Sequence, residues 1–287
     1  MPWLLLSLSM LFWAQTPPPD LQGRLQRLTD SSGAEVSVVL RSLDGKNDVL
    51  IEPDRKFHAA STMKVPVMIE LFRQAAAGQL TLDEPLPIKN EFHSIVDGSV
   101  YQLSVGDDSD ADVYKAVGTS LSLRQLCEAM ITVSSNFAAN LLIERVGVAN
   151  VRTAVRRLGA DGMLVLRGVE DQKAFDLGLN NSTTARALAT LMQDLAEGKA
   201  VSTAADAEMV AILKRQKFND GIPAGLPAGT PVAHKTGTIT KIHHDAAIVY
   251  GPRPYVLVVL VRGIQDEKVS AALMASISRE AWQELSK

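Results

Sequence analysis

The chain has a single cysteine, few aromatic residues and no strong excess of charge of either sign. Because Cys127 is the only cysteine among 287 residues, no disulfide can form within the chain, and an apolar core must stabilise the fold alone. The formal net charge is -3, and the lysines and arginines are scattered, which disfavours nucleic acid as a partner. With 46% hydrophobic and 21% charged residues, the composition is typical of a folded globular protein.

Hydrophobic runs long enough to span a membrane are absent from the sequence. Residues 1–14 are mostly apolar but too few to cross a bilayer comfortably, and three prolines follow at 17–19. We interpret this segment as a secretory signal peptide ending at residue 14, or as late as about residue 20, although no Lys or Arg precedes it. An uncleaved N-terminal anchor is the alternative. We expect the mature protein to be periplasmic or secreted, without a stable membrane span.

Several catalytic signatures are also missing. The sequence has no H-E-x-x-H motif or cysteine cluster for a metal, and no G-x-S-x-G for an α/β-hydrolase nucleophile. His243, His244 and Asp245 are adjacent, but successive residues of a strand point to opposite faces and make a poor ligand set. We therefore expect no metal and no cofactor. The other histidines are interpreted as structural or cleft-wall residues: His58, His93 and His234.

The apolar pattern predicts strands near both ends of the chain and helices between them. Residues 35–41 and 47–52 are rich in strand-forming residues and flank Asp44-Gly45, a hairpin signal. Three late strands are expected at the approach to Lys235, at 246–250 and at 255–261, the last two joined by a hairpin at 251–254. Helices are predicted over residues 64–77, 123–133, 137–146, 183–197 and 267–285.

Strands from both ends of the chain imply one sheet with a helical region inserted between its halves. We predict an α/β (α+β) fold in which residues 21–60 and 220–287 form a discontinuous α/β subdomain. Residues 61–219 form a helical subdomain in this prediction. A functional site is expected in the cleft between the two parts.

The first chemical motif is Ser61-Thr62-Met63-Lys64, at the predicted start of an apolar helix. The unpaired amides and dipole of a helix start favour a developing oxyanion near Ser61. Lys64 lies about one turn further along the same face, within reach of the Ser61 hydroxyl. A lysine has a reference pKa of about 10.4, so a role as a base requires burial or neighbouring charge. The alternative is a capping serine followed by a solvated lysine.

The second motif, Ser134-Ser135-Asn136, lies between two predicted helices. Ser134 is a candidate to pass a proton to a leaving amide nitrogen, and Asn136 is a candidate to hold the amide carbonyl of a substrate. An ordinary turn that caps a helix is the alternative explanation for this motif on its own.

The third motif is Lys235-Thr236-Gly237-Thr238, which we expect at the edge of the sheet. Lys235 offers a cation, and Thr236 and Thr238 offer hydrogen bonds, to a substrate carboxylate. Gly237 allows the backbone of a substrate to approach closely, and the amide of Thr238 is a second candidate oxyanion donor beside that of Ser61.

In this order, the three motifs resemble the signature of class A β-lactamases and penicillin-binding proteins. The resemblance covers nearly the whole mature chain and implies one β-lactamase-like domain with a five-stranded antiparallel sheet. It also implies a loop glutamate that activates the water for deacylation. Glu170 is the best candidate for this glutamate, and Asp171 is its competitor. A solvated loop glutamate is the alternative.

Several positions depart from the pattern of the resembled family. Ser135 replaces an aspartate, Asp171 replaces the proline after the glutamate, and Ala174 stands where an asparagine is usual. The loop-bracing Arg-Asp pair of the family is not in register, although Arg167 is near. Residues 94–118 lengthen the chain between the first two motifs, and they either border the cleft or form a surface insertion. We therefore expect the residues needed for acylation to be present, whereas some groups that usually support deacylation are missing.

The leading functional hypothesis is a monomeric serine β-lactamase that hydrolyses a β-lactam through an acyl-enzyme at Ser61. Ser134 relays a proton, Glu170 activates the deacylating water, and either Lys64 or Glu170 is the base for acylation. The second hypothesis is a penicillin-binding D-Ala-D-Ala carboxypeptidase that acts on peptidoglycan stem peptides. A binding module without catalysis is the third hypothesis.

Overall fold

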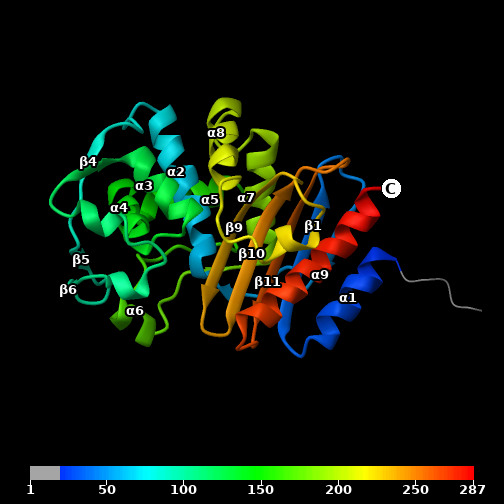
Figure 1. Ribbon diagram of the computed structural model, residues 1–287. Helices are drawn as coiled ribbons and strands as arrows, with labels where there is room; N and C mark the ends of the chain where they lie inside the picture. The colour runs from blue at the N-terminus through cyan, green and yellow to red at the C-terminus, as the bar shows by residue number, and fades with distance from the viewer. Residues whose placement is uncertain (1–19) are drawn as a thin grey trace, which may run out of the picture.

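A five-stranded antiparallel sheet built from both ends of the chain organises the structure (Figure 1). The computed structural model describes residues 20–287, so the predicted signal peptide at residues 1–14 lies outside the described residues. The strand order is β2-β1-β11-β10-β9, which confirms the predicted fold class and places β9 at an edge. The five strands are β1 (Glu35–Ser42), β2 (Asp48–Ile51), β9 (Val232–Ile239), β10 (Ile242–Val249) and β11 (Tyr255–Arg262).

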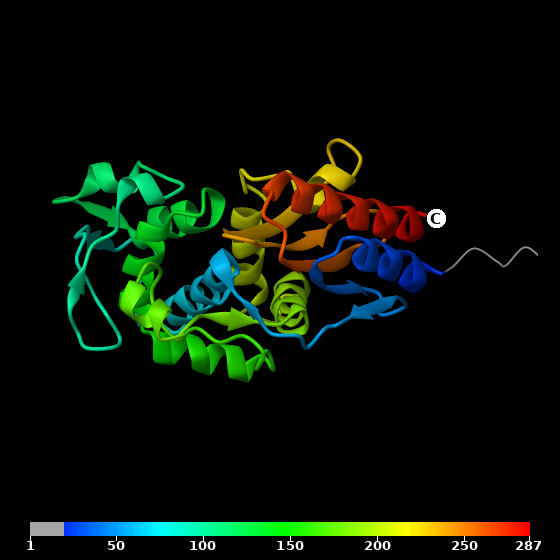
Figure 2. The ribbon, with the colours of Figure 1, turned by 90° about the horizontal axis from the view of Figure 1, so that it is seen from below.

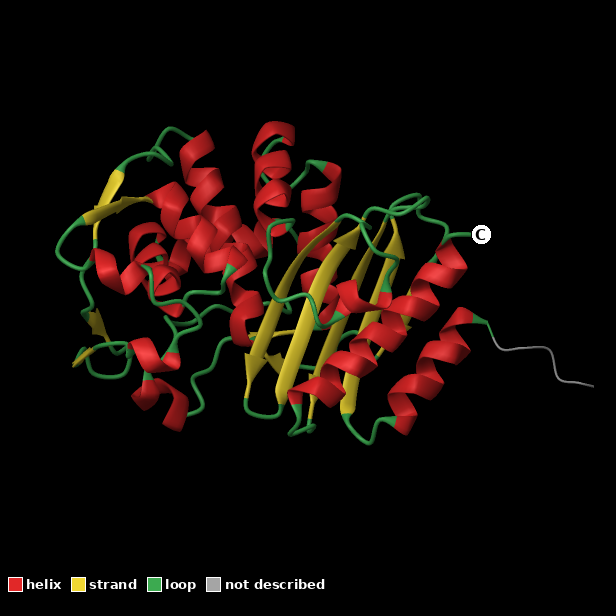
Figure 3. Cartoon of the chain, viewed as in Figure 1, coloured by secondary structure: helices red, strands yellow, loops and turns green. Residues whose placement is uncertain are grey.

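The chain between β2 and β9 carries most of the described helices, which gather beside the sheet (Figure 3). The helices are α1 (Leu21–Ser31), α2 (Lys64–Ala76), α3 (Leu123–Thr132), α4 (Asn136–Val146), α5 (Val148–Arg157), α6 (Gln172–Asp176), α7 (Ala185–Glu197), α8 (Thr203–Leu213) and α9 (Glu267–Leu285). Short 3₁₀ helices are η1 (Ala60–Met63), η2 (Val105–Asp107), η3 (Val113–Ala116) and η4 (Ile222–Gly225). Short paired strands are β3 (Phe57–His58) with β8 (Ser182–Thr183), β4 (Pro85–Pro87) with β7 (Ser120–Ser122), and β5 (Phe92–His93) with β6 (Val100–Tyr101). Within residues 20–287, no helix is both long and apolar enough to cross a membrane.

Both faces of the sheet are covered, which explains why its middle strand, β11, is apolar at almost every position. Helices α1 and α9 pack on one face and α7 packs on the other (Figure 2). Along β11, Leu257 and Val259 join the core beneath α1 and α9, whereas Val258 and Leu260 join the larger core shared with α2, α4 and α7. The alternation of side chains along one strand thus links the two cores.

The predicted hairpins and helices are found within a few residues of their expected positions. The helix expected from residue 183 begins at Ala185, because Ser182–Thr183 pairs with β3 and the Thr184 hydroxyl caps the helix by accepting a hydrogen bond from the Ala187 amide at 3.1 Å. Helices α1, α5, α6 and α8 were not among the predicted elements. The proposed division into subdomains at residues 60/61 and 219/220 stays a prediction.

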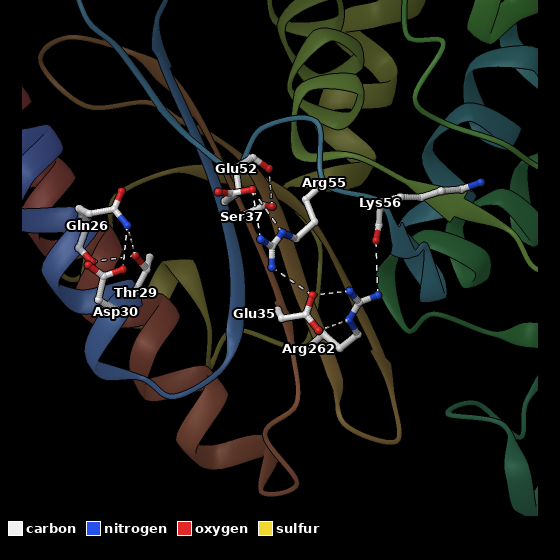
Figure 4. A network of polar contacts seen from close by, with 9 residues as sticks. All are labelled: Gln26, Thr29, Asp30, Glu35, Ser37, Glu52, Arg55, Lys56 and Arg262. Atoms are coloured by element: carbon white, nitrogen blue, oxygen red, sulfur yellow. Dashed lines mark hydrogen bonds and ion pairs between the residues drawn. The ribbon is translucent and has the colours of Figure 1, made fainter.

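A polar network fastens the segment after β2 to the sheet, and this segment leads to Ser61 (Figure 4). Glu35, at the start of β1, accepts hydrogen bonds from Arg55 at 3.1 Å and from Arg262, at the end of β11, at 3.0 Å. Arg262 also donates to the backbone carbonyl of Lys56 at 3.4 Å. The approach to the first motif is thereby held against the strand that crosses the middle of the sheet.

The packing of η4 on α9 leaves no room for a side chain at Gly225. A Cβ atom there would lie 2.1 Å from the carbonyl oxygen of Ala275 and 2.8 Å from the Cβ of Ser278. We expect Gly225→Ala to lower the free energy of unfolding by about 1–3 kcal/mol, as overpacking does. The control is Gly106→Ala, whose Cβ would meet only the Ser104 hydroxyl at 3.6 Å. Equal stability of both variants in denaturant titrations would contradict this packing.

Candidate active site

Ser61 lies in η1, on a turn whose backbone is under strain. The residue before it, Ala60, has φ of 45°, a conformation that residues other than glycine rarely adopt. The amide of Ala60 donates to Nδ1 of His58 at 3.0 Å. Burial, together with the charge of Arg167, lowers the pKa of His58, which keeps the ring in the neutral form that can accept this bond. The local structure therefore holds Ser61 in a fixed position.

Lys64 is fully buried at the start of α2, and its amine lies among four oxygen atoms. Nζ lies 3.1 Å from Ser61 Oγ, 2.6 Å from the Ser134 carbonyl oxygen, 3.3 Å from Ser134 Oγ and 2.8 Å from Asn136 Oδ1. Burial lowers the pKa of Lys64 to about 7, although the carboxylates of Asp108 and Glu170 act in the opposite direction. Lys64 is therefore not the solvated lysine of the alternative explanation.

The neighbours of Lys64 determine where its hydrogens and its lone pair point. The Ser134 carbonyl and the Asn136 Oδ1 atom can only accept hydrogen bonds. A neutral amine has two hydrogens, so both are used by these acceptors, and its lone pair is left for a hydroxyl group. The hydroxyl of Ser61 at 3.1 Å is the nearer of the two hydroxyls present. This arrangement suits removal of a proton from Ser61.

Ser134 stands between two buried amines. Its Oγ lies 3.0 Å from Nζ of Lys235 and 3.3 Å from Nζ of Lys64. Burial, together with the charge of Lys64, brings the pKa of Lys235 well below its usual range. Ser134 itself has φ of 60°, which turns the chain sharply before α4. A hydroxyl between two amines is well placed to relay a proton.

Asn136 connects Lys64 to Glu170. Its Oδ1 accepts from Lys64, and its Nδ2 donates to Oε1 of Glu170 at 2.9 Å. Burial raises the pKa of the half-buried Glu170, and this residue also has a positive φ, of 63°. We predicted that Asn136 holds a substrate carbonyl. Nδ2 carries a second hydrogen, so Asn136 can still donate to a substrate carbonyl while it binds Lys64 and Glu170.

Asp171, the competitor of Glu170, serves the loop instead. Its buried carboxylate accepts hydrogen bonds from the Ser94 hydroxyl at 2.8 Å, the Ile95 amide at 2.9 Å and the Ala174 amide at 3.2 Å. These bonds tie the Glu170 loop to the turn between β5 and β6. Three of the roughly four lone-pair sites of this buried carboxylate are thus used within the loop, so Asp171 braces the loop that carries Glu170.

Two further residues that flank the loop replace the bracing expected from the resemblance. Arg167 donates to the carbonyl of Leu179 at 2.9 Å and to Asn180 Oδ1 at 3.0 Å, across the base of the loop. Asn140 of α4 holds Val169, accepting from its amide at 2.7 Å and donating to its carbonyl at 3.0 Å. The residue before Glu170 is thus clamped to α4, a contact that sequence analysis missed.

The third motif lies on edge strand β9, beside Ser61. A Cβ at Gly237 would lie 3.1 Å from the Ser61 amide nitrogen and 3.2 Å from the Ala60 Cβ, so glycine permits this close approach. Thr236 is partly buried, whereas Thr238 is exposed and donates to Oε1 of Glu267 at 3.2 Å.

A cleft of about 1110 Å³ joins the three motifs. Ser61, Ser134 and Asn136 line it, together with Thr236 and Thr238 of β9. Its walls also include Asp107 and Ser109 from the 94–118 stretch, and it continues along α9. The structure thus brings the motif residues to one cleft, although they lie up to 177 positions apart in the sequence, from Ser61 to Thr238.

The adjacent histidines of β10 point to opposite sides of the sheet, as expected. His243 Nδ1 lies 2.7 Å from the Ser270 hydroxyl of α9, whereas His244 Nε2 lies 2.9 Å from the carbonyl of His58. Burial lowers the pKa of His244 to about 4. His244 is therefore a neutral support for the turn that carries the nucleophile. His234 is buried against Asp245, at 2.9 Å, and is likewise structural.

The geometry defines a serine nucleophile with a buried amine as its base, on a sheet-and-helix fold. Comparisons with known proteins agree with this class. The model of the beta-lactamase enzyme family matches residues 20–285, and the chain belongs to this family.

Individual relatives are distant but match along nearly the whole chain. The extended-spectrum beta-lactamase PER-1 of Pseudomonas aeruginosa is 25% identical over 284 residues, which cover 95% of this chain and 89% of that protein. The structure of an ancestral class A beta-lactamase of Gram-negative bacteria has a TM-score of 0.79 at 26% identity, covering 92% of this chain and 100% of the other. A PBP-A mutant solved as an acyl-enzyme complex with penicillin G also has a TM-score of 0.79 at 26% identity, covering 94% and 98%. The protein is thus a serine acyl-transfer enzyme of the class A β-lactamase and PBP-A type.

The lowered pKa of Lys64 predicts the pH dependence of acylation. If neutral Lys64 accepts the Ser61 proton, the acylation rate constant is constant above pH 7 and falls below it, by about tenfold per pH unit. Stopped-flow acylation by a chromogenic β-lactam between pH 5 and 9 measures this profile. In Glu170→Gln the fall in rate at low pH should persist but move to lower pH, because the charge of Glu170 raises the pKa of Lys64. We call this fall in rate at low pH the acidic limb of the profile. Its loss in Glu170→Gln would show that Glu170 is the base instead.

Proposed function

We propose that the protein is a serine β-lactamase that hydrolyses the β-lactam amide through an acyl-enzyme at Ser61. The observation that carries this proposal is the buried amine of Lys64, which lies within hydrogen-bonding distance of Ser61 and Ser134. The family relationship supports β-lactams as the class of substrate.

In the acylation step, Ser61 Oγ attacks the lactam carbonyl carbon while its proton passes to the neutral amine of Lys64. The amides of Ser61 and Thr238 stabilise the oxyanion. As the carbon–nitrogen bond breaks, Ser134 donates its proton to the ring nitrogen and is reprotonated by Lys64. The proton of Ser61 thus ends on the leaving nitrogen. Lys235, Thr236 and Thr238 hold the substrate carboxylate.

In the deacylation step, Glu170 removes a proton from water, and the water oxygen attacks the acyl carbon. The bond between the acyl carbon and Ser61 Oγ then breaks, and the proton held by Glu170 returns to Oγ, so both residues regain their starting forms. Two observations favour a slow step. The Asn136 amide already occupies Oε1 of Glu170 at 2.9 Å, and Ala174 offers no polar group to orient a water. The loop itself is firmly held through Asp171 and Asn140.

The same two observations favour a second candidate function. A penicillin-binding D-Ala-D-Ala carboxypeptidase would use the same acylation machinery, and its β-lactam acyl-enzyme would persist. In that case the extended strand β9 pairs with the stem peptide of peptidoglycan. PBP-A, which is as similar in structure as the β-lactamases, makes this a realistic competitor.

We also propose that the mature protein is a monomer located in the periplasm or outside the cell. The apolar residues 1–14 support export, and the lone cysteine, Cys127, is buried and compatible with an oxidising compartment. Expression in a Gram-negative host should yield periplasmic protein whose intact mass lacks 14 to about 20 N-terminal residues. Full-length protein found in the membrane fraction would support an uncleaved anchor.

Time-resolved mass spectrometry with benzylpenicillin tests the proposed function, with Glu170→Gln as the diagnostic variant. We expect wild-type protein to release product in repeated turnovers, and Glu170→Gln to accumulate an acyl adduct on Ser61, with turnover at least about a hundredfold slower. Ser61→Ala is the negative control and should remain unmodified. A wild-type adduct that persists for hours, together with release of D-Ala from a D-Ala-D-Ala peptide, would establish the carboxypeptidase instead.

A further inference from the structure

The carboxylate of Asp108 lies against the start of α4, directly behind the second motif. Oδ1 accepts a hydrogen bond from the amide of Asn136 at 2.9 Å, and Oδ2 accepts one from the amide of Phe137 at 2.9 Å. The hydroxyls of Tyr114 and Ser135 donate to Oδ2 at 3.2 and 3.4 Å. The amide of Asp110 also donates to Oδ1, at 3.3 Å, so the partly buried carboxylate has five donors around it.

The segment that carries Asp108 is itself attached to the helical region. The Ser109 hydroxyl donates to the carbonyl of Val133 at 2.6 Å, one residue before the second motif. The ring of Tyr114 packs on that of Phe137, with ring centroids 4.6 Å apart. The contacts of Ser109 and Tyr114 therefore hold the backbone around Asp108 in place. A loosely attached surface insertion would lack such contacts.

Asp108 accepts hydrogen bonds from backbone amides that have no partner at the start of a helix. The amides of Asn136 and Phe137 belong to the first turn of α4 and have no partner within the helix. The Ser135 side chain caps only the Ala138 amide, at 3.2 Å. A negative charge at this end of the helix is also favourable to the helix dipole. The carboxylate thereby stabilises the chain where Ser134 adopts its strained φ of 60°.

We propose that Asp108 is a positioning residue for acyl transfer: through the Asn136 and Phe137 amides, it holds the Ser134-Ser135-Asn136 turn in register with Lys64 and Glu170. Asn136 is the link, because its backbone binds Asp108 while its side chain binds both Lys64 and Glu170. The stretch 94–118 is then part of the active site rather than a surface insertion. The inference rests on the proposed acyl-transfer function of Ser61.

Removing the charge of Asp108 should lower the pKa values of Lys64 and Glu170. Four charged or titratable groups surround Asp108: Lys64 of α2, Glu170 of its loop, Tyr114 of η3 and the neighbouring Asp107. Lys235 of β9 lies beyond Lys64 and interacts with that residue. The anionic carboxylate of Asp108 raises the pKa of both Lys64 and Glu170. Without it, both pKa values fall. The acidic limb of the acylation profile then moves to lower pH, whichever of the two is the base.

The first test compares Asp108→Asn with Asp112→Asn. The asparagine keeps the shape but leaves one helix amide facing an NH₂ group. The carboxylate of Asp112, by contrast, is exposed and accepts a hydrogen bond from the exposed Lys115 at 2.6 Å. We expect the acylation rate constant of Asp108→Asn with benzylpenicillin to fall about 10- to 100-fold, as for a displaced catalytic group. Its acidic limb moves to lower pH, and Asp112→Asn stays within about twofold of wild type.

The second test is a double-mutant cycle with Ser135→Asp. Ser135 Oγ lies 3.4 Å from Asp108 Oδ2, so an aspartate at 135 places two carboxylates together in the wild-type background and slows acylation. In Asp108→Asn, the same substitution returns an anion to the start of α4, and we expect acylation to recover by at least about fivefold. The effect of Ser135→Asp therefore changes sign between the two backgrounds.

The outcomes separate this inference from the proposed function. If wild-type protein forms no adduct with benzylpenicillin, the proposed function fails. If wild type is acylated and Asp108→Asn matches it in rate and pH profile, Asp108 has no positioning role. A slower Asp108→Asn with an unshifted acidic limb and no recovery by Ser135→Asp would show a role in stability alone, and it would also overturn the inference.

Discussion

The burial of one amine, that of Lys64, is the constraint on which the rest of the site depends. A charged lysine without water is costly, so the site must either neutralise it or surround it with acceptors, and this one does both. The Ser134 carbonyl and the Asn136 amide oxygen take its two hydrogens, which leaves the lone pair for Ser61. Each of these acceptors is fixed by something else in turn: Ser134 by a strained turn, and Asn136 by Glu170 and Asp108.

Backbone strain is concentrated around this amine. Of the five non-glycine residues with positive φ among those described, three lie in the site: Ala60, Ser134 and Glu170. Each is unfavourable by itself and persists because hydrogen bonds on both sides hold it. Lys64, Asn136 and Lys235 lie on α2, α4 and β9, and Ser61 and Ser134 lie directly before the two helices. Glu170 lies on a loop held by Arg167, Asn140 and Asp171. Rigid elements thus carry the first step, and the second depends on a braced loop.

Much of the fold was predictable because hydrophobic periodicity and turn residues act locally. The hairpin at Asp44-Gly45 and helix α9 at residues 267–285 were found at the predicted positions. The motifs also identified Ser61, Lys64, Ser134 and Lys235, which the structure brings together. The bracing groups were not predictable. Asp108 lies 28 positions from Asn136, and Asp171 lies 77 from Ser94, and a short polar stretch has no pattern that reveals such partners. The positive φ of Ala60 also has no signature in sequence, because alanine does not favour it.

The most direct test of the central claim is the protonation state of Lys64 in the free enzyme. Protein labelled with ¹³C at the lysine ε-carbon is titrated by NMR, and Lys64→Arg protein identifies the signal that belongs to this residue. We predict that the Lys64 signal titrates near pH 7. It and the signal of the buried Lys235, whose pKa is also lowered, should be separated from the exposed lysines, which titrate at about pH 10.4. If the Lys64 signal titrates with the exposed lysines, the amine is charged at neutral pH, and Lys64 cannot be the resting base for Ser61.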